Sequence, residues 1–221
     1  MIKKINYFVQ AFFIYSFFFM GRVFGIKISR KIFSFLFSFV GPFFKSKKTI
    51  DKNLNIFKKN ISLEDKNRII QNMWKNYGMT FIEYIFLSTL RNNTTNVEIL
   101  GENNLKTPLD ENKPVIFISG HFANFELMSM AITKKNINLA TIYRPLNNFL
   151  INPLMENLRK KYVCKNQIKK GINGVRETIE YIKKKHSIAL MIDQRVSEGE
   201  RVNFFGKLAL TTTLPAQLAI K

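Results

Sequence analysis

The chain has 221 residues, with 35 Lys and Arg against 15 Asp and Glu, and its formal net charge is +20. Hydrophobic residues make up 46% of it, which excludes a disordered polybasic tail and leaves enough apolar surface for the core of an ordinary domain. A single cysteine, Cys164, and two histidines exclude a disulfide framework, a cysteine-based zinc site and a histidine-rich metal centre.

The N-terminal segment is both apolar and basic. Of the 22 Phe, 13 lie in the first 44 residues, and an uncharged run of 17 residues extends from Ile5 to Gly21. Three interpretations are open: a cleaved signal peptide, although no A-x-A-like site follows; a buried core helix; and a membrane-associated hairpin. The surrounding Lys and Arg favour the third, on the anionic cytoplasmic side of a membrane. We expect residues 1–44 to be membrane-associated, either spanning the bilayer or lying in its interface.

Residues 45–96 are expected to form a basic linker and a long amphipathic helix. The sequence Ser62-Leu63-Glu64-Asp65 is typical of a helix start. Apolar residues then recur at three- and four-residue spacing, which predicts a helix over about 63–89 with one buried face. Glu83 falls within the apolar half of this helix. It is either an exposed acid at the rim or a residue with a pairing or functional role.

Residues 97–221 alternate between short apolar runs and helix-like stretches. The runs at 114–119, 139–143 and 187–192 are typical of buried central strands, and helices are predicted at about 124–135, 149–161 and 173–185. This alternation predicts an α/β fold with a mainly parallel central sheet and helices on both faces. In such sheets chemistry gathers beyond the carboxyl ends of the strands, which here are Gly120-His121, Arg144 and Asp193-Gln194-Arg195.

The motif GHFANFE holds the first candidate catalytic residues. His121 directly follows a predicted strand, and Glu126 comes five residues later, at the predicted start of a helix. A carboxylate there can reach the imidazole, hold one tautomer and leave the other nitrogen to take up a proton. Gly120 lets the backbone approach a substrate closely. From spacing alone, His121 is either this base or a satisfied structural histidine.

The motif is similar to the H-x4-D/E motif of glycerolipid-type acyltransferases, and its surroundings resemble the lipid A biosynthesis (lauroyl/myristoyl) acyltransferase family most. The resemblance runs from about residue 20 to the last residue, and Glu83 falls where that family tends to place a Glu. Four segments carry it in order: TIDKNLNIFKKNISLEDKNRI, VIFISGHFANFELM, TIYRPLNN with NPLMENLRKKY, and ALMIDQ with VNFFGKLALTTTLPAQLA.

The resemblance implies a role for each candidate residue. His121 is expected to be the general base that removes the proton from an acceptor hydroxyl, with Glu126 orienting it. Arg144 and Arg159 are expected to bind substrate, Arg144 through a phosphate group. Alternatively, Arg144 makes a surface salt bridge, and Arg159 belongs to a solvated basic face. Asp193 and Gln194 are expected to position the site or to bind a sugar-phosphate head group.

The resemblance also implies substrates, partners and location. The acyl donor is expected to be acyl carrier protein or coenzyme A, without a cofactor or metal, and the acceptor a glycolipid such as a lipid A precursor. The expected location is the cytoplasmic side of the inner membrane, against its anionic leaflet, with no nucleic-acid partner. Family members continue beyond the apparent helix at 213–221, so a C-terminally truncated copy is expected. The alternatives are a non-catalytic, basic, membrane-tethered binding protein, or the same chemistry on a glycerophosphate lipid or another glycolipid.

Overall fold

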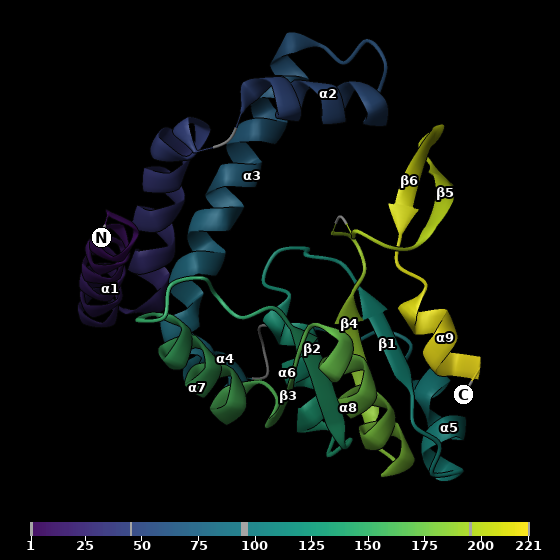
Figure 1. Cartoon of the computed structure of the whole chain (residues 1–221). Coiled ribbons are helices and arrows are strands. Elements are labelled where there is room, and N and C mark those ends of the chain that lie inside the picture. The colour runs from purple at the N-terminus through teal and green to yellow at the C-terminus, as the bar shows by residue number, and fades with distance from the viewer. Residues whose placement is uncertain (1, 45, 94–96, 195, 221) are drawn as a thin grey trace. The chain divides into compact units, whose positions relative to one another are not determined.

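The computed structural model describes residues 2–44, 46–93, 97–194 and 196–220. It divides the chain into two compact units, which are described separately below (Figure 1). The first unit holds Met1–Phe13, Leu87–Val196 and Thr212–Lys221, and the second holds Ile14–Phe86 and Ser197–Thr211. Arg195, which the sequence analysis named at a strand end, lies outside the described residues.

The N-terminal helix α1 (Ile2–Val40) turns back on itself at Gly25, where the backbone leaves the helical region with φ 72° and ψ 169°. Glycine tolerates this left-handed φ without a steric penalty. In the second unit, the Ser29 hydroxyl donates to the Gly21 carbonyl oxygen at 3.0 Å, and the rings of Phe17 and Phe33 meet edge to face at 5.4 Å. The two arms of the helix are therefore packed against each other on either side of Gly25, as a helical hairpin.

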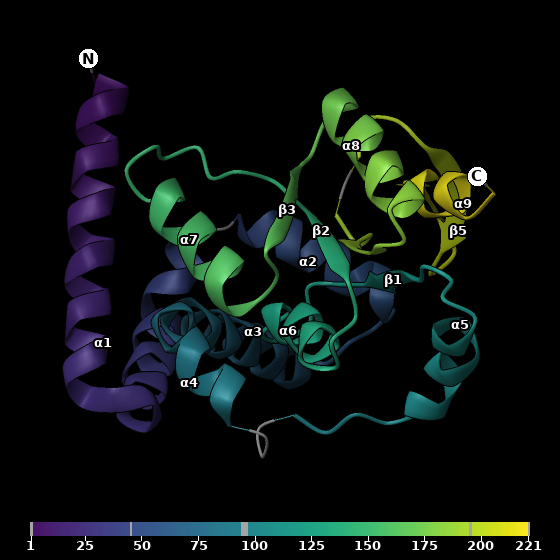
Figure 2. The same cartoon turned by 90° about the horizontal axis from the view of Figure 1, so that it is seen from below.

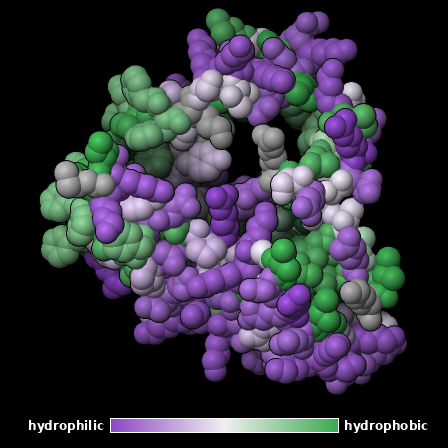
Figure 3. Space-filling model, in the orientation of Figure 1, coloured by the Kyte–Doolittle hydropathy of each residue, from purple (hydrophilic) through white to green (hydrophobic). Residues whose placement is uncertain are grey.

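Much of the apolar surface of α1 is exposed. Phe12, Phe19, Phe35 and Phe39 each expose about 70% of their surface, and Figure 3 shows hydrophobic residues gathered over this helix. The helical stretch Ile2–Phe43 is long and apolar enough to cross a membrane, by the criteria of length and composition alone. Only 17% of its most apolar window is buried within the protein, so the stretch differs from an ordinary core helix.

The second unit also contains two further helices and a β-hairpin. Helix α2 (Lys47–Phe57) forms within the expected linker, and helix α3 (Leu63–Glu83) ends in a 3₁₀ turn, η2 (Tyr84–Phe86). Ser62 caps α3 by accepting from the Asp65 backbone N–H at 3.0 Å. Glu83 is buried and pairs with Arg30 of α1 at 2.6 Å, so of the two alternatives for this acid the pairing role is confirmed. An antiparallel hairpin, β5 (Glu200–Phe204) and β6 (Lys207–Thr211), completes the unit.

The first unit is built on a four-stranded parallel sheet. Its strands are β1 (Ile116–Ser119), β2 (Leu139–Tyr143), β3 (Asn166–Lys169) and β4 (Ser187–Met191), in the spatial order β1-β4-β2-β3. The last strand in sequence thus lies between the first and the second. The register pairs Ser119 with Met191 and Tyr143 with Lys169, so each of these pairs of strands ends at the same level.

Helices cover both faces of this sheet, as Figure 2 shows for α6 (Glu126–Lys134) and α8 (Ile172–Lys183). On one face, Ala140, Ile168, Ile188 and Leu190 form a core cluster against Tyr181 and Ile182 of α8. Helix α6 packs on the other face, against β2. The remaining helices of this unit are α4 (Leu87–Asn92), η3 (Glu102–Leu105), α5 (Lys106–Asp110), α7 (Asn152–Tyr162) and α9 (Leu214–Ile220).

The predicted α/β fold with a parallel sheet is confirmed, and three of its four strands lie where the apolar runs indicated. Strand β3 was not predicted because its sequence, NQIK, is mostly polar, as an edge strand allows. The helix predicted over about 63–89 is regular only to Glu83, and after the 3₁₀ turn the chain continues as α4. The β5–β6 hairpin was also missed, since all residues of β5 are exposed and its pattern carries no buried face.

The contact between α1 and α3 gives a stability prediction. A Cβ added at Gly78 would lie 2.1 Å from the Phe33 carbonyl oxygen, so the helices approach each other at backbone distance. Gly78→Ala should destabilise the protein by about 1–3 kcal/mol, as overpacking does. Without this contact, alanine would stabilise α3 by about 1 kcal/mol. Denaturant unfolding in detergent shows whether Gly78→Ala lowers or raises the free energy of unfolding. Asn72→Ala, at an exposed position of the same helix, is the control.

Candidate active site

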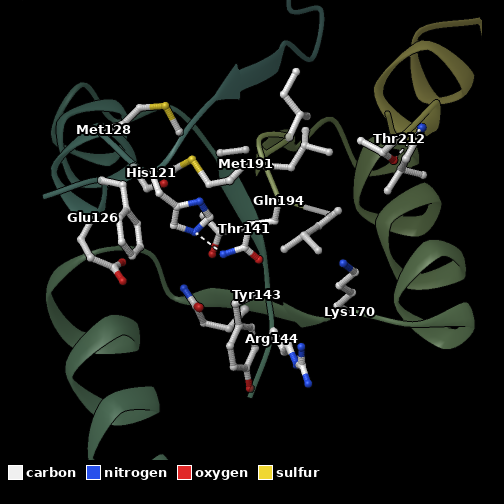
Figure 4. A pocket seen from close by; sticks show the side chains of 18 of the residues that line it. His121, Glu126, Met128, Thr141, Tyr143, Arg144, Lys170, Met191, Gln194 and Thr212 are labelled. Carbon is white, nitrogen blue, oxygen red and sulfur yellow. Dashed lines mark hydrogen bonds between the residues drawn. The ribbon is translucent and has the colours of Figure 1, made fainter. Parts of the chain in front are cut away.

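The candidate site lies at the carboxyl ends of the four parallel strands, in a cavity of about 370 Å³ (Figure 4). His121 comes two residues after the end of β1, and Asp193 two residues after the end of β4. Because Ser119 and Met191 are partners in the parallel register, His121 and Asp193 lie side by side beyond them. In the same way, Arg144 follows β2 directly and Lys170 follows β3 directly, next to each other in the sheet.

His121 and Asp193 form a close pair through two separate hydrogen bonds. The imidazole Nδ1 lies 2.7 Å from Asp193 Oδ1, and the backbone N–H of His121 donates to Asp193 Oδ2 at 2.8 Å. Partial burial alone would raise the pKa of Asp193, but the hydrogen bonds from the His121 backbone and side chain lower it below its ordinary value. Asp193 is therefore a carboxylate at neutral pH, and Nδ1 carries the proton that it accepts.

The other imidazole nitrogen of His121 faces Gln194. The side-chain amide nitrogen of Gln194 lies 3.3 Å from His121 Nε2, the contact drawn as a dashed line in Figure 4. With the proton on Nδ1, the nitrogen Nε2 holds a lone pair and can accept a proton. His121 also lies edge to face against Phe125, with ring centroids 4.6 Å apart. The imidazole is thus held from three sides, with its basic nitrogen at the wall of the cavity.

Gly120 fits this arrangement because a side chain at this position would be tight against Asp193 and Phe122. An added Cβ would lie 3.2 Å from Asp193 Oδ2 and 2.9 Å from the ring of Phe122. Gly120 therefore allows the close approach of the Asp193 carboxylate, and its expected approach to a substrate stays a prediction.

Glu126 takes a different partner from the one expected. It is buried at the first position of α6, and its Oε1 accepts from Arg159 Nε of α7 at 2.7 Å, with 8% and 13% of the two side chains exposed. Asp193 is the carboxylate at His121 Nδ1, and the orienting role of Glu126 stays a prediction. Glu126 instead fixes the guanidinium of Arg159 in the wall of the same cavity.

The part of the cavity at the carboxyl ends of β2 and β3 is lined by basic side chains. Arg144 and Lys170 line it at the two strand ends, together with Arg159, and Figure 4 shows Arg144 and Lys170 across the cavity from Glu126. Tyr143 lines it as well and donates to Glu156 Oε1. Burial, followed by this hydrogen bond to Glu156, raises the pKa of Tyr143, so it stays a neutral phenol. Lys170 was missed because it follows a strand that the sequence did not predict.

Cys164 does not line this cavity. Cys164 is buried, as expected, and burial raises the pKa of its thiol, which leaves it protonated and unreactive. Among the described residues, no group of three or more His, Cys, Asp or Glu side chains is arranged to hold a metal ion. The chemistry available in the cavity is proton transfer at His121 and charge pairing at Arg144, Arg159 and Lys170.

Comparison with known proteins matches the chain to a family. The sequence model of a family described as "Bacterial lipid A biosynthesis acyltransferase" matches residues 2–221. No curated protein matches the chain closely enough to be counted as a relative.

The His121–Asp193 pair predicts a pH dependence of stability. Because the pKa of Asp193 is lower in the folded protein than in the unfolded chain, its carboxylate stabilises the fold above its ordinary pKa of 3.8. This stabilisation is lost as the pH falls through the lowered folded value. Asp193→Asn should therefore lower the melting temperature at pH 5–7 and cease to differ from the parent at the lowest pH. Equal melting temperatures across the whole range would contradict the pairing.

Proposed function

Because the chain belongs to the bacterial lipid A biosynthesis acyltransferase family, we propose that it moves a fatty acyl chain from an acyl thioester to a hydroxyl group of a glycolipid such as a lipid A precursor. The observation that carries this proposal is the geometry of His121. A carboxylate holds Nδ1 at 2.7 Å while Nε2 borders a cavity with basic side chains.

The proposed reaction is a direct transfer. The acceptor hydroxyl takes the place of the Gln194 amide at Nε2 of His121 and donates its proton there. Its oxygen attacks the thioester carbonyl carbon, so that a C–O bond forms and the C–S bond breaks. The thiolate leaves and takes the proton back from the imidazolium. Asp193 stabilises the imidazolium between these steps, and no covalent acyl-enzyme is formed.

The basic wall of the cavity suits a phosphorylated acceptor. Arg144 and Lys170 stand together at the ends of β2 and β3, and a guanidinium binds phosphate through two parallel hydrogen bonds. Arg159, fixed by Glu126, adds a third cation to the same cavity. We assign these residues to the phosphate-bearing head group of the acceptor, with Gln194 beside the reacting hydroxyl.

The donor and the location follow from charge and exposed apolar surface. Acyl carrier protein, the donor that we propose, is acidic and suits a chain with a net charge of +20; coenzyme A, whose phosphates are also anionic, is the alternative donor. The exposed Phe residues of α1 suit a bilayer, and basic residues among them suit the anionic cytoplasmic leaflet. Within the first unit, the Asn148 amide donates to the Tyr7 carbonyl oxygen at 2.9 Å, which ties the start of α1 to the loop after Arg144. We therefore place the reaction at the inner face of the cytoplasmic membrane.

The test is the replacement of His121 by Ala, with His186→Ala as the matched control. His186 is the other histidine and precedes β4, away from the strand ends that form the cavity. Loss of a general base lowers transfer by about 10²–10⁴-fold. We expect this loss for His121→Ala, unchanged membrane association, and parent-like activity for His186→Ala. Transfer is measured by mass spectrometry over a panel of acyl thioesters and glycolipid acceptors.

Retained transfer in His121→Ala would exclude His121 as the base. Absence of transfer by the parent protein on every donor and acceptor, together with steeply salt-dependent binding to anionic lipid or DNA, would favour the non-catalytic alternative.

A further inference from the structure

A pocket of about 420 Å³ in the first unit lies at the amino ends of β2 and β3, whereas the candidate active site lies at their carboxyl ends. Its lining comes from the beginnings of these two strands and from the last turns of α4, α6 and α7. Helix α4 contacts both α6 and α7, and Figure 2 shows the three helices together. The volume is within the range of about 300–1,000 Å³ that is typical of ligand sites.

The pocket is basic, and we call it the basic pocket below. Among the described residues that line it, four are cationic and none is acidic; the cations are Arg91, Lys160, Lys161 and Lys165. Within the described part of the chain, none of these four side chains forms an ion pair with a carboxylate. By contrast, Arg30 and Arg159 each pair with a buried Glu. The basic pocket therefore gathers positive charge without a counter-ion from the described residues.

Arg91 is the partly buried cation of the basic pocket, and it is held in place from one side. Its Nη1 donates to the Thr133 hydroxyl oxygen and to the Tyr162 carbonyl oxygen, each at 3.0 Å. The Thr133 hydroxyl in turn lies 2.7 Å from the Val163 carbonyl oxygen. Among the described residues, Nε and Nη2 of Arg91 have no hydrogen-bonding partner. These two nitrogens form one edge of the guanidinium, and such an edge binds two oxygens of a phosphate at once.

The basic pocket is distinct from the candidate active site, although both are lined by α7. Arg159 lines the active-site cavity, whereas Lys160 and Lys161 line the basic pocket. Consecutive residues of an α-helix are rotated by about 100°, so neighbouring side chains can serve different cavities. An anion bound in the basic pocket is therefore separate from one bound at Arg144 and Lys170.

We propose that the basic pocket binds a ligand that carries a phosphate group, held by the open edge of Arg91 and by the surrounding lysines. This inference is independent of the proposed acyl transfer. The dipole of α7 favours Lys160 and Lys161, because they lie in its last turn. The dipole does not require Lys165, which lies beyond the helix, or the open edge of Arg91. A phosphate accounts for all four cations together.

Lysine acetylation, mapped by mass spectrometry, tests the site residue by residue. The full chain is placed in phosphatidylcholine vesicles and titrated with inorganic pyrophosphate at constant ionic strength. We expect saturable protection of Lys160, Lys161 and Lys165 from acetylation. Lys184 is exposed, lines neither cavity and should react at an unchanged rate. Lys170 reports separately on anion binding in the candidate active site.

A double variant tests whether the lysines bind the anion. Lys160→Ala with Lys165→Ala removes two exposed cations, each worth about threefold, so the pyrophosphate concentration that half-protects Lys161 should rise about tenfold. Lys183→Ala with Lys184→Ala changes the net charge equally at exposed positions near the end of α8 and should leave that concentration unchanged. An equal shift in both double variants would show a general charge effect and would overturn the proposal.

A second arm of the experiment identifies the source of the phosphate group. The protein is placed, without pyrophosphate, in vesicles made of equal parts of phosphatidylglycerol and phosphatidylcholine. Protection of Lys160, Lys161 and Lys165 in these vesicles identifies a lipid head group, and protection by pyrophosphate alone identifies a soluble ligand. No protection of these lysines in either arm, protection of Lys170 alone, or equal protection of Lys184 would overturn the proposal.

Discussion

The parallel pairing of β1 with β4 is the constraint on which the site depends. Its register makes Ser119 and Met191 partners, and the next two residues on each strand bring His121 and Asp193 together. A shift of this register by one residue would reverse the face of every side chain on one strand and separate the pair. The buried side chains of Ile188, Ala189 and Leu190 on β4 hold the register, since this strand lies inside the sheet.

The candidate site residues are divided between two pairs of strands at the carboxyl end of the sheet. The β1 and β4 ends carry the imidazole, its carboxylate and Gln194, whereas the β2 and β3 ends carry Arg144 and Lys170. Between them, the buried Glu126–Arg159 pair links α6 to α7. In the proposed reaction, proton transfer and anion binding are therefore assigned to the ends of different strands.

Much of this could be predicted from the sequence, and the missing parts have physical reasons. His121, Arg144, Asp193 and Gln194 follow apolar runs that indicated strands. Glu126 was named from its spacing after His121, and the resemblance to a known family added Arg159. The hydrogen-bond partner of His121 could not be predicted, because the hydrophobic periodicity of a sequence does not give the spatial order of its strands. The order β1-β4-β2-β3 places Asp193 beside His121, whereas the orienting role of Glu126 stays a prediction.

The most direct test of the central claim is a double-mutant cycle on acyl transfer with His121→Ala and Asp193→Asn. Residues that act as one unit are strongly non-additive, since removing the second costs little once the first is gone. If Asp193 acts through His121, the double variant should transfer at the same residual rate as His121→Ala alone. Losses that multiply would show that the two residues act independently and would contradict the account.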